Sequence, residues 1–208
     1  MKIHVLELGP LGTCCYIATD EATNLCAVID PADSCEVILD QTEKKGYKID
    51  KILLTHMHFD HIGPLNRLAD VTGAEIFIGS GDADGLSSPF LNLSQAFGQP
   101  FTCDHKVCRV NEGDSIYIGK TKLSVLHTPG HTPGSVCYEY ADGKVIFSGD
   151  TVFYQSIGRT DFPGGSYKQI MASLERILSF NEEYVLYPGP GPKTTVGDEK
   201  KYNPYYER

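Results

Sequence analysis

Short apolar segments rich in β-branched residues alternate with polar turns along the first half of the chain. Such segments are typical of buried strands, whereas apolar residues at intervals of three and four are typical of amphipathic helices. Two segments of the second kind lie between the strands, and each closes on a glycine that suits a helix C-terminus. The predicted helices cover residues 35–47 and 61–73, and the predicted strands cover residues 3–8, 14–20, 25–31, 51–55 and 74–80.

The second half repeats this order of strands followed by a helix. It begins after a polar stretch with proline and glycine, residues 79–104, and a turn is predicted at Asp142 and Gly143. The predicted strands lie within residues 114–128, 135–149 and 184–188, and an amphipathic helix covers residues 166–180.

Two similar halves of strands and helices predict the α/β class. The strands are expected to form two sheets packed face to face, with the helices on the outer faces and the loops at one shared edge. No low-complexity tract or linker interrupts the chain, so residues 1–208 are interpreted as a single domain.

Composition and charge exclude several classes of protein. With 208 residues, of which 41% are hydrophobic, the chain can bury a sizeable core. Its first residues contain no apolar run long enough for a signal peptide or a membrane span, which predicts a cytoplasmic protein without a membrane partner. The formal net charge is −9 and no cluster of lysine and arginine occurs, so nucleic acid is not an expected partner.

The chain contains seven cysteines without the paired spacing of a disulfide framework. An odd number of unpaired thiols favours a reducing compartment. Cys103 and Cys108 fit no metal-ligand spacing, and we interpret them as buried or loop thiols without a function.

The candidate chemistry is concentrated in the sequence THMHFDH at residues 55–61. It follows the apolar segment KILL directly, so a buried strand delivers His56, His58, Asp60 and His61 to a sheet edge. In an extended loop, the period of two places His56 and His58 on the same side. Imidazole and carboxylate are ligands that borderline divalent metals accept, and the sequence therefore predicts a metal site.

Two later motifs add candidate ligands at strand ends. The sequence TPGHTPGS places His131 in a loop that proline and glycine stiffen, and SGDT places Asp150 after another strand. Each motif alone is weak, because a single histidine or a Gly-Asp pair is common in turns. Together with the first cluster, they strengthen the prediction of a metal centre.

These motifs make the sequence similar to the metallo-β-lactamase superfamily, and within it to short bacterial glyoxalase II-like proteins. The similarity extends over nearly the whole chain, through THMHFDH, HTPGHTPGS, SGDT, SIGRTDFPGGS and TTVGDEKKYNPY. It implies an αββα four-layer sandwich of two mixed sheets with a two-metal site. By motif position, it implies that His56, His58 and His131 bind the first metal, that Asp60 and His61 bind the second, and that Asp150 bridges them.

The resemblance fails at one ligand. Family members carry a histidine in a PGHGP loop, whereas this chain reads PGPGP and has Pro190 at that position. A proline ring offers no lone pair, since its nitrogen is part of the amide bond. We therefore expect one tight metal site and a weakened second site. Zinc is the expected metal, and the same ligands also accept iron or manganese.

The resemblance implies a metal-dependent hydrolase of acyl thioesters, such as hydroxyacylglutathione or a related thiol ester. Metal-activated hydroxide would attack the carbonyl carbon, with Asp60 as proton acceptor. The thiolate would leave without being protonated, unlike the amine that leaves when an amide is cleaved. Arg159 is a candidate for binding a carboxylate of the substrate, although an ion pair with Asp161 is an equal interpretation. Longer family members hold glutathione with an added C-terminal region. We therefore expect a small-molecule thioester as the partner and do not assign its thiol to glutathione.

Two alternatives accompany this prediction. A persulfide dioxygenase of the same family uses one iron held by two histidines and an aspartate, which His56, His131 and Asp150 could supply. Such a mononuclear site would tolerate Pro190. The other alternative is a metal-binding relative that has lost catalysis, and the six retained ligand types argue against it.

Overall fold

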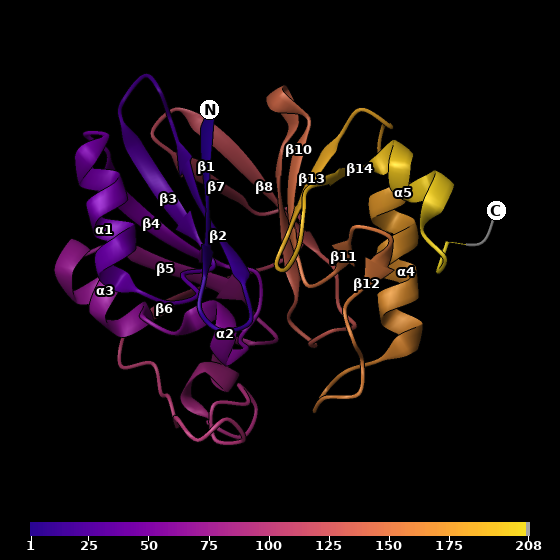
Figure 1. The fold of residues 1–208 in the computed structure, drawn as a ribbon, viewed down its shortest axis with the longest axis horizontal. Helices are drawn as coiled ribbons and strands as arrows, with labels where there is room; N and C mark the ends of the chain where they lie inside the picture. Colours follow the sequence, from indigo (N-terminus) through magenta and orange to yellow (C-terminus); the bar gives the residue numbers. More distant parts are fainter. Residues whose placement is uncertain (207–208) are drawn as a thin grey trace.

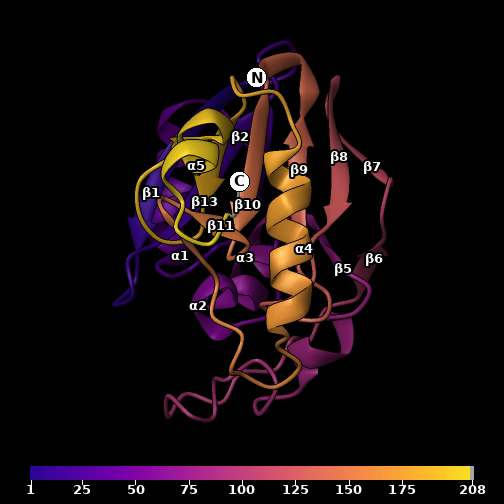
Figure 2. The ribbon, with the colours of Figure 1, turned by 90° about the vertical axis from the view of Figure 1, so that its right-hand side faces the viewer.

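Two six-stranded mixed sheets form the centre of the computed structural model, which describes residues 1–206. The first sheet has the order β1-β2-β3-β4-β5-β6 and the second the order β14-β13-β10-β9-β8-β7. Helices α1 and α3 cover the outer face of the first sheet, and α4 and α5 cover that of the second (Figures 1 and 2). This arrangement confirms the predicted four-layer α/β architecture.

The first half consists of β1 Lys2–Leu8, β2 Thr13–Thr19, β3 Leu25–Ile29, α1 Cys35–Lys44, β4 Lys48–Leu54, α2 Phe59–Ile62, α3 Leu65–Thr72, β5 Glu75–Gly79, the 3-10 helix η1 Ala83–Ser87 and β6 Val107–Val110. Those of the second half are β7 Ser115–Ile118, β8 Thr121–His127, β9 Val136–Tyr140, η2 Ala141–Gly143, β10 Val145–Gly149, β11 Val152–Phe153, β12 Ser156–Ile157, α4 Tyr167–Leu178, β13 Val185–Pro188, β14 Thr194–Thr195 and α5 Val196–Tyr202.

The central strands are buried on both faces, and their successive side chains enter two different core layers. On β2, Cys15 and Ile17 pack toward the helices, whereas Cys14 and Tyr16 pack between the two sheets. A third apolar layer lies between the second sheet and α4. Successive side chains of a strand point to opposite faces, so one apolar strand serves two core layers.

One predicted helix is divided. Residues 61–73 were expected to form a single helix, but α2 ends at Ile62 and α3 begins at Leu65. Pro64 lies between them with a non-helical φ of −94° and ψ of 18°, and its ring nitrogen has no hydrogen to continue the hydrogen bonds of α2. The predicted cap at Gly73 is confirmed, because this glycine has a left-handed φ of 66° at the end of α3.

The parallel strands bring distant loops to one edge. In the first sheet, β3, β4, β5 and β6 run parallel, so the residues that follow β3 and β4 meet at the same end. In the second sheet, β10 and β13 are parallel, and the segments after Gly149 and Pro188 lie together. Candidate sites of open sheets form where the carboxyl ends of strands meet. None of the helices in the described part of the chain is both long and apolar enough to cross a membrane.

Candidate metal centre

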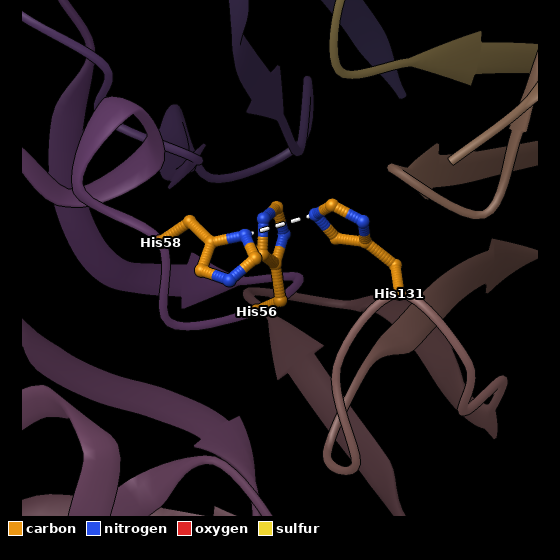
Figure 3. Close-up of side chains that lie close together, drawn as sticks. All are labelled: His56, His58 and His131. Atoms are coloured by element: carbon orange, nitrogen blue, oxygen red, sulfur yellow. Dashed lines mark hydrogen bonds between the residues drawn. The ribbon is translucent and has the colours of Figure 1, made fainter. Parts of the chain in front are cut away.

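Three buried histidines from two separate loops converge between the sheets. His56 and His58 follow β4, and His131 lies on the loop after β8. Figure 3 shows that the three rings point toward one another. Each is at most 2% exposed. One ring nitrogen from each lies within 4.8 Å of the others, and His58 Nδ1 is 2.9 Å from His131 Nε2. The structure thus brings together the three side chains predicted for the first metal.

A second group lies beside the first and shares His56 with it. His56, His61 and Asp150 also offer ligand atoms within 4.8 Å of one another. His61 Nε2 lies 3.3 Å from Asp150 Oδ1 and 3.6 Å from Asp60 Oδ2. The Asp60 carboxylate accepts a hydrogen bond from the Thr13 hydroxyl at 3.2 Å. All six side chains predicted from the motifs therefore lie at one centre, and their division between two metals remains a prediction.

Asp30 orients two of the histidine rings. Its carboxylate accepts bonds from the Thr55 amide at 2.8 Å, the Thr55 hydroxyl at 2.7 Å and His61 Nδ1 at 3.0 Å. Because the Thr55 hydroxyl donates to Asp30, its oxygen accepts from His56 Nδ1, 3.1 Å away. Both rings consequently donate through Nδ1 and direct Nε2 toward the centre, where a bound metal would take the place of any proton on that nitrogen.

His131 is oriented by a backbone carbonyl. Its Nδ1 lies 2.7 Å from the Arg159 carbonyl oxygen, an acceptor only, so Nδ1 donates and Nε2 keeps its lone pair. This bond comes from the main chain of Arg159 and is independent of the guanidinium.

Asp82 joins the two histidine loops. It is fully buried, and it accepts bonds from the Met57 amide at 3.1 Å, the Thr132 hydroxyl at 2.6 Å and the Gly134 amide at 2.6 Å. Met57 lies between His56 and His58, and Thr132 follows His131. The carboxylate thereby sets the spacing between the loops, and burial raises its pKa above the ordinary value.

Burial and charge divide the histidines into two kinds. Burial, followed by the charges of neighbouring histidines, lowers the pKa of His56, and burial with His131 lowers the pKa of His58 to about 3. Burial also opposes a charge on His61, but the carboxylates of Asp60, Asp150 and Asp30 outweigh it and raise the pKa of His61. For Asp150, burial is outweighed by His61, and its pKa is lowered. Neutral imidazoles beside concentrated negative charge suit a divalent cation.

Buried ligand atoms without hydrogen-bond partners are a further sign that these side chains suit a metal. His56, His58 and His61 each have a buried Nε2 without a hydrogen-bond partner among the described residues, and the same holds for Asp150 Oδ1. A buried polar atom without a partner is costly, by about 1–3 kcal/mol. Such atoms on four residues of the two ligand groups are explained if bound cations satisfy the groups.

The loop that carries Pro190 remains beside this centre. The Gly189 carbonyl accepts from the Cys14 amide at 2.7 Å, and the Gly189 amide donates to the Gly149 carbonyl at 2.9 Å. A Cβ atom on Gly189 would lie 2.2 Å from Asp150 Oδ1, so only glycine allows this approach. Pro190 pairs with Thr13 in an antiparallel bridge. The absent imidazole is thus a change of side chain on a backbone held in place.

Arg159 lies at the rim of the centre with its side chain occupied. Its guanidinium makes two 2.6 Å bonds to the Asp161 carboxylate, and its centre lies 4.0 Å from the ring of Phe162. The ion pair with Asp161 is therefore present, and a role in substrate binding remains a prediction.

Asp30 and Asp82 were not found by sequence reasoning. Asp30 does carry a signal, because it directly follows the apolar strand β3 and precedes Pro31, as Asp150 follows β10. Asp82 carries none, since it stands in a polar stretch and its partners are as many as 52 residues away in the sequence.

Replacing Asp30 with asparagine is expected to lower metal affinity by about 10–100-fold, the range for ligand-orienting residues. The amide keeps the shape and one acceptor, but an NH2 group in place of Oδ2 cannot accept the hydrogen bonds from the Thr55 hydroxyl and His61 Nδ1. Zinc affinity is measured by competition with a chelating dye, and the melting temperature of the metal-free protein checks folding. A metal affinity equal to that of the wild type would contradict the orienting role; Asp40→Asn, at an exposed carboxylate of α1, is the matched control.

The sequence matches the family model described as the Metallo-beta-lactamase superfamily over residues 8–189. Hydroxyacylglutathione hydrolase GloC of Haemophilus influenzae is 33% identical over 211 residues, covering 99% of this chain and 98% of GloC.

Solved structures agree with this match. BLEG-1 B3 metallo-beta-lactamase has a TM-score of 0.93 at 35% identity, covering 98% of this chain and 99% of that one. TTHA1623 in a di-iron-bound form has a TM-score of 0.89 at 34% identity, covering 98% and 100%. ETHE1 from Myxococcus xanthus has a TM-score of 0.81 at 28% identity, covering 98% and 84%.

Proposed function

Because the chain belongs to the metallo-β-lactamase superfamily, we propose that it is a metal-dependent hydrolase of acyl thioesters. The observation that carries this proposal is the group of buried, partnerless ligand atoms next to Asp60, a carboxylate still 22% exposed. Such a site combines a dry ligand cluster with a proton acceptor that substrate and water can reach. The similarity to GloC supports a thioester as the substrate class.

The protein's own residues have distinct roles in this reaction. His56, His58 and His131 would hold the metal, with Asp150 and His61 beside it. When bound, the ion would lower the pKa of water and polarise the carbonyl oxygen. Asp60 takes the proton of the attacking water, and Thr13 holds its carboxylate in position. Water adds to the carbonyl carbon, the carbon–sulfur bond breaks, and the products are a carboxylate and a thiol.

Zinc is the metal that we propose, since imidazole and carboxylate ligands suit it and it needs no redox partner in hydrolysis. The ligand set also suits iron, and the similar TTHA1623 was solved in a di-iron-bound form.

A panel of thioesters tests the proposal. Metal-stripped protein is reloaded with zinc, iron(II) or manganese, and the release of thiol is followed with a chromogenic reagent. We expect turnover only after metal is added. Release of no thiol from any ester by the loaded protein would contradict the proposed function.

A second candidate function is oxidation of a persulfide by oxygen at a single iron. Pro190 favours it, because the set of His56, His131 and Asp150 that would hold a single iron is complete without residue 190. The similarity to ETHE1 is in agreement. Oxygen uptake by the iron-loaded protein with glutathione persulfide distinguishes the two: uptake without thioester cleavage favours oxidation, and cleavage without uptake favours hydrolysis.

We expect close to one tightly bound metal per chain after mild dialysis. The first set has three imidazoles, whereas the second lacks the ligand that Pro190 replaces. Metal content is measured by inductively coupled plasma mass spectrometry against protein concentration. Two retained ions per chain would contradict a weakened second site.

Arg159→Ala is expected to raise KM for an anionic thioester about tenfold with kcat little changed, because the side chain contributes binding and no chemistry. Asp161→Ala is the matched change, since it frees the guanidinium from its present partner and should lower the same KM. Steady-state kinetics measures both. Unchanged KM in both variants would leave Arg159 with a structural role alone.

A further inference from the structure

A cleft of about 290 Å³ opens beside Asp60. The loop between β1 and β2 forms one wall, and the start of α2 and the loop near Phe97 form the other. Thr13, which bonds to Asp60, also lines it. The volume is at the small end for ligand pockets, so it suits one arm of a substrate. We call it the Phe97 cleft.

The walls of the Phe97 cleft are apolar and accessible. Leu11 is 52% exposed and Phe97 is 54% exposed, although both are large hydrophobic side chains. The ring of Phe97 stacks on that of Phe59, with centroids 4.2 Å apart. Phe59 directly precedes Asp60, so the aromatic pair reaches from the rim to the metal centre. Water on such surfaces is displaced favourably by an apolar group.

The charged side chains that line the Phe97 cleft are negative. Asp33 and Asp60 are its charged residues, and the described residues that line it include no lysine or arginine. Neither carboxylate has an ion pair with a lysine or arginine among the described residues. A substrate carboxylate placed near Asp33 would meet like charge without a lysine or arginine in the cleft to compensate it.

We propose that the Phe97 cleft binds an uncharged, apolar arm of the thioester, and that the site prefers such esters over those of glutathione. This inference rests on the proposed function and defines its substrate class. Glutathione carries two carboxylates, which the apolar and acidic cleft disfavours. The apolar arm can belong to the acyl group or to the thiol, since both flank the carbonyl carbon.

Three esters separate the possibilities. S-benzoyl-N-acetylcysteamine has an apolar acyl arm, S-benzyl thioacetate has an apolar thiol arm, and S-D-lactoylglutathione has neither. We expect the first or the second to have at least a tenfold higher kcat/KM than the third. Phe97→Ala should raise KM for the preferred ester about tenfold, in the range for one lost apolar contact. Tyr117→Ala, an exposed aromatic residue on β7, is the control.

The charge of Asp33 is tested separately. Asp33→Asn keeps the acceptor for the Ser34 amide and removes the negative charge. The ratio of kcat/KM for the glutathione ester to that for the neutral ester should rise about threefold, and further in Asp33→Lys. This ratio is independent of any equal loss of activity through misfolding.

The outcomes distinguish the inference from the function on which it rests. If the loaded protein cleaves none of the esters, the proposed function fails. If it cleaves lactoylglutathione best and Phe97→Ala changes the three esters equally, hydrolysis stands and the assignment of the cleft is overturned.

Discussion

Replacing His56 with alanine is expected to abolish tight metal binding and to lower thioester turnover about a thousandfold or more. His56 is the one histidine shared by both groups of ligand atoms, and its ring lies 4.1–4.8 Å from those of His58, His61 and His131. Alanine supplies no lone pair, and the buried position leaves no other side chain to replace it. Metal content and kcat/KM are measured on the same preparation.

His105→Ala is the matched control for this change. His105 pairs with Asp70 at the surface, 3.3 Å away, and removing it should leave metal content and turnover unchanged. Melting temperatures of the metal-free proteins show whether each variant folds. Full turnover by a folded His56→Ala protein would show that the histidine cluster is not the catalytic centre.

Replacing Pro190 with histidine is expected to raise affinity for a second metal about 10–100-fold. Directly opposed residues of an antiparallel bridge point to the same side, and Pro190 is opposite Thr13. The Thr13 hydroxyl reaches Asp60, so a side chain at position 190 is directed toward the same carboxylate. The hydrogen bonds of Gly189 to Cys14 and Gly149 keep the loop in place. Calorimetric titration of metal into the metal-free protein measures the second binding step.

Pro190→Ala separates the imidazole from the loss of proline. Both variants lose the fixed φ of proline, but alanine brings no ligand. The account predicts stronger second-site binding in Pro190→His alone. An equal gain in both would attribute the effect to backbone freedom, and no gain in either would mean that the loop presents residue 190 elsewhere.

The ligands could be predicted from sequence because they are local in the chain. THMHFDH places four of them in one short segment after an apolar strand, two before α2 and two within it, and the strand-end rule places His131 and Asp150 at the same edge. Asp30 and Asp82 were missed because their roles depend on hydrogen bonds to residues 25 or more positions away. The bonds of Asp30 follow from the pairing of β3 with β4, and those of Asp82 to Thr132 and Gly134 join loops of the two sheets; apolar periodicity specifies neither.

The elements missed by the prediction are short or depend on packing. The strand β6 adds only Val107–Val110 to the edge of the first sheet. Helix α5 has charged residues over most of its length, and it begins where the Thr195 hydroxyl accepts from the Asp198 amide. Neither has the long apolar pattern that identified α4, so neither stands out in the sequence.

The most direct test of the central claim is to titrate zinc into the metal-stripped protein while thiol release from S-benzoyl-N-acetylcysteamine and S-D-lactoylglutathione is followed. The account predicts no turnover without metal, a linear rise to about one equivalent, and little further gain from a second. Turnover that is unaffected by removing the metal, or no turnover at any zinc concentration, would contradict a hydrolase built on the centre formed by His56, His58 and His131.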